Sequence, residues 1–213
     1  MNTEPAKRRD ALARLFAQSP YPLSNSAQKA LETWLDGIAE YNERIDLTAA
    51  RTDDELVDLM IADAALLAQH IAPNARVVDV GSGAGAPGLP LSILRPDVHM
   101  TLVEPIDKRV AFLRRTLGLI AGRAQVVRGR ADVLLRQKQT FDVAISRATL
   151  PPEKWLSVGS ELAPHVWVLL AQGAPPENEH RKATQDIVYT WPLTGVSRRA
   201  VCYSPRVIEL SQV

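Results

Sequence analysis

Residues 76–88 read Arg-Val-Val-Asp-Val-Gly-Ser-Gly-Ala-Gly-Ala-Pro-Gly, and this stretch decides the fold. The run 76–80 is short, apolar and β-branched, which predicts a buried parallel strand, and a helical pattern follows over 87–95. Gly81, Gly83 and Gly85 lie between the two, where the backbone has to reverse its direction. Glycines also let a ligand approach the bare backbone, so the stretch predicts a strand, a tight turn and a helix that together bind a nucleotide.

The glycine spacing alone does not decide which nucleotide is bound. Gly81, Gly83 and Ala86 also satisfy the loose dinucleotide fingerprint of NAD-binding proteins, and a turn without any binding role is a second alternative. Asp79 favours S-adenosylmethionine, because its carboxylate can order the loop amides or meet the cationic methionine end of that ligand. Glu104 ends the next predicted strand and can accept hydrogen bonds from ribose hydroxyls, which both ligands carry.

Beyond this stretch, strands and helices alternate. Strands are predicted over 76–80, 99–104, 124–128, 141–145 and 165–171, with helices over 87–95, 107–120, 131–137 and 153–162. Such alternation predicts an α/β fold, a doubly wound, mostly parallel sheet with helices on both faces. A further helix is expected over 177–186. The last two strands, 187–191 and 199–209, leave no room for a helix between them, so an antiparallel C-terminal hairpin is predicted at the sheet edge.

The residues before the first strand have a helical pattern. Helices are predicted over 10–16, 26–41 and 53–70, and the apolar side chains of the second recur at helical spacing. Residues 1–72 are therefore predicted to form an N-terminal helical extension that packs on the core. Residues 73–213 are predicted to form the Rossmann-like domain that binds S-adenosylmethionine.

Composition limits the class of protein. Of the 213 residues, 46% are hydrophobic, which is enough for a substantial core. Cys202 is the single cysteine, so the sequence excludes a disulfide framework and a cysteine metal site, and a reducing compartment is the simpler interpretation. The sequence shows no signal-peptide core and no apolar run of membrane-spanning length, which predicts a cytoplasmic protein with no membrane partner.

Charge is segregated along the chain although the net charge is only +1. Residues 32–63 carry ten acidic and two basic side chains, whereas residues 107–138 carry nine basic and two acidic ones. The basic segment predicts attraction to a polyanion such as RNA, with Lys108 and Arg109 contacting phosphates without contributing to cofactor binding. Solvated helix faces are an equally good explanation of the same charges.

Two further strand ends carry polar groups at the same predicted edge of the sheet. Ala131 and Asp132 follow the third strand, where the Asp132 carboxylate can accept a hydrogen bond from an adenine amino group. Asp132 could instead cap the helix that follows. Arg147 follows the fourth strand, where a methyl acceptor would approach, and an ion pair with Glu104 or Asp132 is the alternative role for its guanidinium.

Four motifs then point to a family. They are Asn42-Glu43-Arg44-Ile45-Asp46-Leu47-Thr48, the run 78–90, Lys108-Arg109-Val110-Ala111-Phe112-Leu113 and Phe141-Asp142-Val143-Ala144-Ile145-Ser146-Arg147-Ala148. Together they resemble the bacterial ribosomal RNA small subunit methyltransferase G family, also called glucose-inhibited division protein B. The resemblance implies a class I methyltransferase that uses S-adenosylmethionine to methylate N7 of a guanosine in 16S rRNA. It also implies cofactor contacts from Gly81, Ala86, Ala131, Asp132 and Arg147.

The chain departs from that family pattern at two places. Leu59 and Met60 stand where the family usually has an Arg-His pair, and Gln172 stands where it usually has a lysine. The lost groups would be RNA or active-site contacts, so a paralogue with another substrate and a cofactor-binding protein without turnover are alternatives. A nucleotide-dependent oxidoreductase is the alternative from a different enzyme class.

The hypothesis from the sequence is an rRNA (guanine-N7)-methyltransferase that acts as a monomer on 16S rRNA or the small ribosomal subunit. Guanine N7 has a free lone pair and no proton to remove, so no catalytic residue is assigned and Arg147 is the positioning candidate. No metal site is expected. The cofactor-binding residues are expected to be Gly81, Gly83, Gly85, Ala86, Glu104, Ala131, Asp132 and Arg147.

Overall fold

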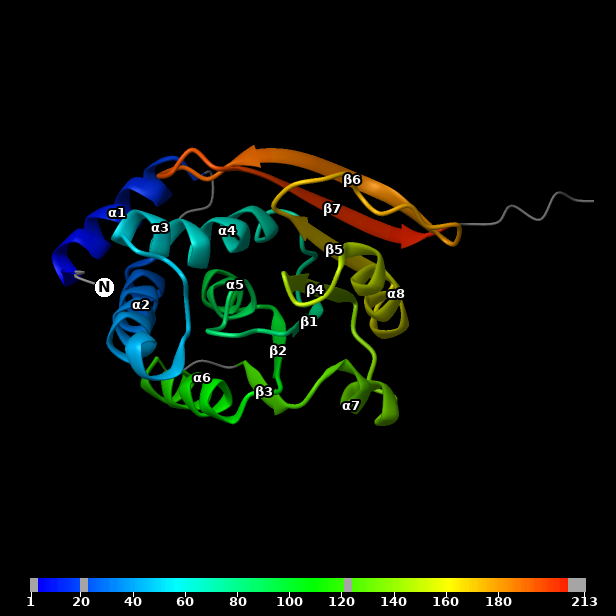
Figure 1. The fold of residues 1–213 in the computed structure, drawn as a ribbon, viewed down its shortest axis with the longest axis horizontal. Helices are drawn as coiled ribbons and strands as arrows, with labels where there is room; N and C mark the ends of the chain where they lie inside the picture. Colours follow the sequence, from blue (N-terminus) through cyan, green and yellow to red (C-terminus); the bar gives the residue numbers. More distant parts are fainter. Residues whose placement is uncertain (1–3, 20–22, 121–123, 207–213) are drawn as a thin grey trace, which may run out of the picture.

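A seven-stranded sheet divides the molecule in the computed structural model, which describes residues 4–19, 23–120 and 124–206 (Figure 1). Its strands are β1 (Arg76–Val80), β2 (His99–Glu104), β3 (Gln125–Arg128), β4 (Val143–Arg147), β5 (His165–Leu170), β6 (Arg181–Thr190) and β7 (Ser197–Pro205). They lie in the order β3-β2-β1-β4-β5-β7-β6, with β7 antiparallel to both β5 and β6. The remaining pairs are parallel, which confirms the predicted sheet and its antiparallel C-terminal edge.

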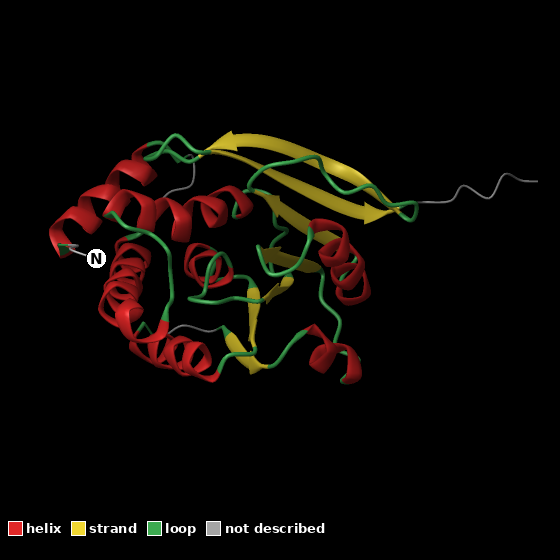
Figure 2. Cartoon of the chain, in the orientation of Figure 1, coloured by secondary structure: helices red, strands yellow, loops and turns green. Residues whose placement is uncertain are grey.

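Helices cover both faces of this sheet (Figure 2). They are α1 (Pro5–Ala17), α2 (Asn25–Ile45), α3 (Asp53–Val57), the π-helix η1 (Asp58–Ala62), α4 (Asp63–Leu67), α5 (Gly88–Leu94), α6 (Asp107–Leu119), α7 (Ala131–Arg136) and α8 (Pro152–Leu162). Side chains of β1 lie in two hydrophobic cores on opposite faces of the sheet. Val77 belongs to the core formed with α1 to α6, whereas Val78 and Val80 belong to the core formed with α7 and α8. This is the period of two expected for a strand buried on both faces.

The N-terminal helices share the first of these two cores with the sheet. Trp34 on α2 is fully buried, and its Nε1 donates to the carbonyl of Ala84 in the glycine loop at 2.9 Å. Arg8 on α1 is buried as well and reaches Asp36 on α2 and Asp53 at the start of α3. The extension therefore supports the loop after β1, and a domain boundary near residue 72 stays a prediction.

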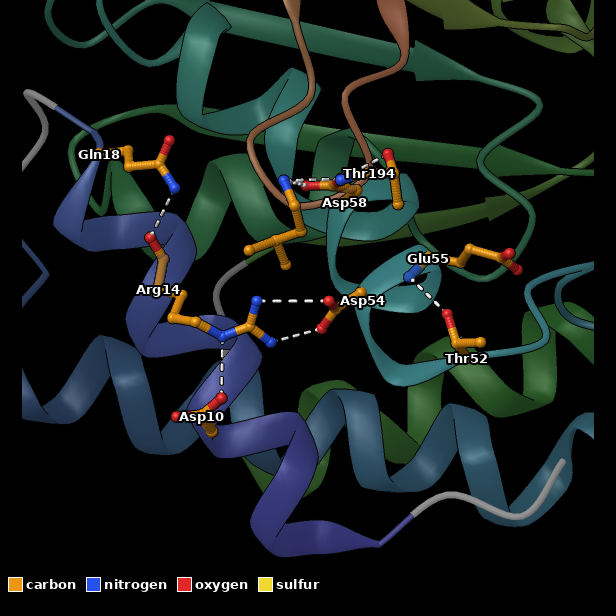
Figure 3. Close-up of polar contacts among 9 residues, drawn as sticks. Asp10, Arg14, Gln18, Thr52, Asp54, Glu55, Asp58 and Thr194 are labelled. Carbon is orange, nitrogen blue, oxygen red and sulfur yellow. Dashed lines mark hydrogen bonds and ion pairs between the residues drawn. The ribbon is translucent and has the colours of Figure 1, made fainter.

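The predicted helix over 53–70 is replaced by α3, η1 and α4 in succession, and the helical segment ends at Leu67. Thr52 caps its start by accepting from the amide of Glu55 at 3.1 Å (Figure 3). The wider π-helical turn carries Asp58, whose carboxylate accepts from the amide and the hydroxyl of Thr194, each at 2.7 Å (Figure 3). Asp58 thus ties this segment to the turn between β6 and β7.

The helix predicted over 177–186 is wrong. Residues 181–190 form β6, the edge strand of the sheet, in which most side chains are exposed. The first part of this strand, 181–186, is mostly polar and lacks the alternation that identifies a strand from sequence, so pairing with β7 decides its conformation. The rest of β6 falls within the strand predicted over 187–191. The last strand was predicted over 199–209, whose final residues, 207–209, lie outside the described part of the chain.

Candidate functional site

The loop after β1 is held in place by the end of the neighbouring strand β2. The amides of Gly81 and Ser82 donate to the carbonyl of Val103 at 2.8 and 3.0 Å. The Glu104 carboxylate accepts from Gly83 N at 2.9 Å and from Ile106 N at 2.8 Å, so one side chain fixes the loops after both β1 and β2. Glu104 is only 2% exposed, which makes both hydrogen bonds strong in a poorly solvated site.

A cavity of about 380 Å³ lies over this glycine loop. We call it the loop cavity. Five of the expected cofactor residues line it: Gly81, Gly83, Ala86, Glu104 and Arg147. Leu59 and Met60 line it as well, and so does Arg109, which also donates to the carbonyl of Asp46 at 2.9 Å. Arg109 is therefore part of the cavity wall, and its expected role as a phosphate contact that leaves cofactor binding unaffected stays a prediction.

The glycines of the loop have different roles. Gly83 has φ +58°, and a Cβ there would meet only a carbonyl oxygen 4.0 Å away, so its missing side chain leaves open space in the cavity. A Cβ on Gly85, in contrast, would lie 3.0 Å from Leu89 and 3.2 Å from Leu113. Gly85 lies outside the cavity lining, and its lack of a side chain allows close packing of the loop on the helices.

Ala131 and Asp132 lie outside the lining of the loop cavity. Asp132 is exposed, and its carboxylate forms an ion pair with Arg136 at 2.8 Å on the same helix. The alternative role as a helix cap is wrong, because Arg130 is the N-cap of α7. Both residues follow β3 at the carboxyl edge of the sheet, so a role for them in reading an adenine stays a prediction.

Asp79 lies beneath the loop and is fully buried. Its Oδ2 accepts from the amide of Gly88 at 3.0 Å, at the start of α5. Among the described residues, its Oδ1 is a buried oxygen without a hydrogen-bond partner. Burial raises the pKa of Asp79 to about 7, and the hydrogen bond from Gly88 opposes this shift.

A second cavity of about 440 Å³ opens beside the β6–β7 hairpin, and we call it the hairpin cavity. Apolar side chains such as Leu150, Trp155 and Val168 form much of its wall. Its polar groups include Asp63, Arg147, Gln172, Tyr189, Trp191 and Arg198. Leu59, Arg147 and Ala148 line both cavities, so the two meet at the carboxyl end of β4. Ala148 has φ +54°, an unusual conformation for a residue with a side chain.

Asp63 is the polar centre of the hairpin cavity. Its Oδ1 accepts from the Tyr189 hydroxyl at 2.7 Å and from Trp191 Nε1 at 2.9 Å, and its Oδ2 accepts from Arg147 Nη1 at 3.0 Å. Arg147 also donates to the carbonyl of Leu59, in the π-helical turn. The alternative predicted from the sequence, an ion pair of Arg147 with Glu104 or Asp132, is therefore wrong, because Arg147 pairs with Asp63.

Sequence reasoning missed Asp63, Tyr189, Trp191 and Arg198. Asp63 is one of ten acidic residues between positions 32 and 63, and nothing in the local pattern distinguishes it. Tyr189 and Trp191 both fall in the strand predicted over 187–191, but their partner lies 126 and 128 residues away in the chain. The available signal was their residue type, since buried Tyr and Trp need a hydrogen-bond partner.

The basic segment is only partly free to meet a polyanion. Arg128 pairs with Asp107 at 2.5 Å, and Arg115 lies over the ring of Tyr41 at 5.1 Å. Lys108 and Arg130 are exposed near the carboxyl ends of β2 and β3, the edge on which both cavities open. Within the described ranges, no cluster of three or more metal-ligating side chains is found and no helix is long and apolar enough to cross a membrane.

Comparison with known proteins places the chain in a family. The family model described as rRNA small subunit methyltransferase G matches residues 27–192, well over half of the chain. The chain belongs to the rRNA small subunit methyltransferase G family. The resemblance inferred from the sequence motifs is thereby confirmed.

Curated members of the methyltransferase G family are 30% to 39% identical to this chain over the aligned residues. A relative from Moorella thermoacetica is 39% identical over 148 residues, covering 65% of this chain and 61% of the relative. One from Mycolicibacterium vanbaalenii is 38% identical over 143 residues, covering 64% of this chain and 63% of the relative. The matches thus span less than two thirds of these two relatives. One from Anaeromyxobacter dehalogenans is 30% identical, covering 76% of each chain.

Solved structures share the fold at low sequence identity. TrmN from Thermus thermophilus has a TM-score of 0.52 at 20% identity, covering 71% of this chain and 48% of that protein. TYW2 from M. jannaschii, solved in complex with AdoMet, has a TM-score of 0.52 at 14% identity, covering 68% of this chain and 75% of that one. These likenesses confirm the class I methyltransferase fold that the sequence predicted.

Proposed function

We propose that the protein binds S-adenosylmethionine in the loop cavity and transfers its methyl group to N7 of a guanosine in 16S rRNA of the small ribosomal subunit. Membership of the methyltransferase G family supports the reaction and the substrate class. The observation that carries the proposal is the cradle formed by Gly83 and Glu104. At Gly83 the missing side chain leaves open space in the cavity, and at Glu104 a buried carboxylate lies in the cavity wall.

The residues of the loop cavity fit this cofactor. Glu104 already accepts two backbone amides, one on each oxygen, but a carboxylate has roughly four lone-pair sites and can accept ribose hydroxyls as well. Gly83 keeps the loop backbone accessible to the ligand. Leu59 and Met60 supply an apolar wall, so the Arg-His pair expected from the family pattern is replaced by side chains that exclude water.

The chemistry supplied by the bound cofactor is an electrophilic methyl group: the N7 lone pair forms the new C–N bond, and the S–C bond breaks with its electrons left on sulfur. No proton moves, so no general base is required. The protein has to orient the acceptor and to keep water out. Arg147 is placed for the first task, because it lines both cavities and its guanidinium is fixed by Asp63 and by the carbonyl of Leu59.

The proposal also covers the setting of the reaction. We infer a cytoplasmic enzyme that acts as a monomer on rRNA or on the assembled small subunit. The exposed basic side chains of Lys108 and Arg130, at the edge where both cavities open, support RNA as the partner. The oxidoreductase alternative has no support from the family to which the chain belongs.

Two measurements test the proposal. Calorimetric titration should show binding of S-adenosylmethionine and none of NAD. Labelled methyl transfer should then be measured on small subunits that lack the modification, on naked 16S rRNA and on 23S rRNA as the control, followed by nuclease digestion to identify 7-methylguanosine. Cofactor binding without transfer to any of these RNAs would favour the cofactor-binding protein without turnover, and transfer to another atom or RNA would favour the paralogue with a different substrate.

A further inference from the structure

Resting on the proposed methyl transfer, we propose that the hairpin cavity receives the acceptor guanine ring and that Asp63 is a positioning residue that neutralises Arg147 beside this ring. The loop cavity and the hairpin cavity share Leu59, Arg147 and Ala148 in their walls. A group bound in one therefore approaches a group bound in the other across the carboxyl end of β4. This is the path along which a methyl group would have to pass.

The shape and lining of the hairpin cavity suit a flat heterocycle. Its volume of about 440 Å³ lies in the ordinary range for small-molecule sites, and its walls are largely apolar. Trp191 is buried in the wall under the guanidinium of Arg198, which lies 3.9 Å from the ring centroid. Arg198 is thus positioned to cover a base that enters the cavity, or to meet the phosphate attached to it.

The polar groups of the cavity match the face that guanine must present. When N7 is the nucleophile it has to stay free, so a donor should engage the neighbouring O6. Arg147 is a donor placed between the two cavities, and the Gln172 amide in the cavity wall supplies a second polar group. Gln172 takes the place of the lysine expected from the family pattern, so this wall carries one positive charge fewer.

Charge explains why Arg147 needs Asp63. Methylation at N7 turns a neutral guanine ring into a cation, so positive charge develops inside the hairpin cavity as the reaction proceeds. An uncompensated guanidinium next to the ring would oppose this change, since like charges repel strongly at low effective dielectric. Asp63 is 2% exposed and bonded to Arg147, so Arg147 remains a hydrogen-bond donor while the ion pair as a whole carries no net charge.

The geometry of Asp63 is rigid because three side chains hold it. Tyr189 and Trp191, from the hairpin, both donate to Oδ1, which leaves Oδ2 for Arg147. The pKa of Tyr189 is raised by burial and by the Asp63 carboxylate, so this hydroxyl remains a donor. Arg147 itself is 18% exposed, and its donation to Leu59 in the π-helical turn limits its motion further.

The test compares Asp63→Asn with Asp58→Asn. Asparagine at position 63 keeps a carbonyl for Tyr189 and Trp191 but loses the negative charge. Asp58 is the matched control, because it is also buried, lies in the π-helix that directly precedes Asp63 and holds the same hairpin through Leu193 and Thr194, yet it is outside both cavity linings. A third variant, Asp63→Asn combined with Arg147→Gln, removes both charges.

The first readout needs neither cofactor nor turnover. Guanosine and 7-methylguanosine are titrated calorimetrically at mildly acidic pH, where the methylated ring keeps its positive charge. Asp63→Asn should lower the ratio of the affinity for 7-methylguanosine to that for guanosine about tenfold, and the double variant should restore most of this ratio. Asp58→Asn should lower the melting temperature and leave the ratio unchanged.

The second readout is single-turnover methyl transfer at saturating rRNA. Asp63→Asn should slow it about tenfold with cofactor affinity preserved, and Asp58→Asn should transfer at the wild-type rate. An unchanged affinity ratio in Asp63→Asn, an equal drop in Asp58→Asn, or a wild-type protein that binds neither nucleoside would each overturn the inference. A wild-type protein that binds the cofactor and both nucleosides but methylates no RNA would overturn the proposed function instead.

Discussion

The two cavities that meet at Arg147 are built in opposite ways. The loop cavity lies over a backbone turn, and the turns after β1 and β2 are fixed by local hydrogen bonds to Val103 and Glu104. The hairpin cavity is formed by side chains from distant parts of the chain, and its central contact joins Asp63 to Trp191 across 128 residues. A site that depends on a backbone turn should therefore lose ligand affinity when the shape of the turn changes. A site that depends on buried charged side chains should lose function when those charges are removed.

Gly83→Val should have the largest effect on the loop cavity. Valine at φ +58° is strained, and its side chain would fill the open space in front of the loop. We expect cofactor affinity to fall by at least about a hundredfold, which calorimetry would measure directly. Full affinity in the folded variant would show that the loop is only a turn.

Gly195→Val is the matched control for backbone strain. Gly195 lies in the turn between β6 and β7, has φ +71°, and has no heavy atom within 4 Å of an added Cβ. Both variants should lose about 1–2 kcal/mol of folding stability from the left-handed conformation. Only Gly83→Val should lose cofactor affinity, and equal losses in the two would mean that strain rather than occupied space is responsible.

Asp79 offers a test that depends on pH. Its pKa is raised from 3.8 to about 7 in the folded protein, so between these values the unfolded chain has released a proton that the folded protein still holds. Stability should therefore fall as pH rises through this window and level off above it. Asp79→Asn lacks this titration. Urea unfolding should therefore show the free energy of unfolding of the variant rising relative to that of the wild type, by a few kcal/mol from about pH 4 to about pH 7. A difference that is constant with pH would contradict a buried, protonated Asp79.

Glu104→Ala should have a smaller effect on cofactor binding than Gly83→Val, because it removes one acceptor and two loop contacts without blocking the cavity. We expect a loss of about 1–3 kcal/mol in cofactor binding free energy. Glu55→Ala is the control, since Glu55 also accepts from a backbone amide, that of Arg51 at 2.7 Å, but lies outside both cavity linings. Calorimetry that gave both variants wild-type affinity would remove Glu104 from the site.

The same contrast explains how much the sequence could predict. The strands 76–80 and 99–104 were predicted with the observed bounds, because β-branched runs followed by glycine or proline carry their signal locally. The loop residues Gly81, Gly83 and Glu104 were identified for the same reason: glycine spacing and an acid at a strand end are local features. Their presence in one cavity wall follows from the parallel order of β1 and β2.

The parts that were missed depend on distant pairing. Residues 181–186 are polar enough to resemble a solvated helix, and only their ladder with β7 makes them a strand that continues into the predicted strand at 187. Asp63 gained its importance from Arg147, 84 residues away, and from the hairpin. Gly85 was expected beside the ligand and lies outside the lining of the loop cavity, because spacing cannot distinguish a glycine that faces a cavity from one that packs on Leu89 and Leu113.

The smallest expected effect concerns the surface around the two cavities. Arg109 is unsuitable for this test because it lines the loop cavity, whereas Lys108 is exposed beside it. A lysine that contacts a phosphate releases about one counterion on binding, so Lys108→Ala should reduce the slope of log affinity against log salt by about one unit and leave cofactor affinity unchanged. Filter binding of 16S rRNA over a range of salt concentrations would measure the slope.

Lys182→Ala separates a local phosphate contact from a general loss of charge. Lys182 is also an exposed lysine, on β6, but it pairs with Ser204 near the end of the hairpin away from the β6–β7 turn, and it lines neither cavity. Both variants remove one positive charge, so an effect of net charge alone would lower RNA affinity alike in the two. If only Lys108→Ala changes the salt slope, the RNA backbone passes beside the loop cavity. If neither variant changes it, the basic segment is a solvated surface, and RNA must be held by the cavities themselves.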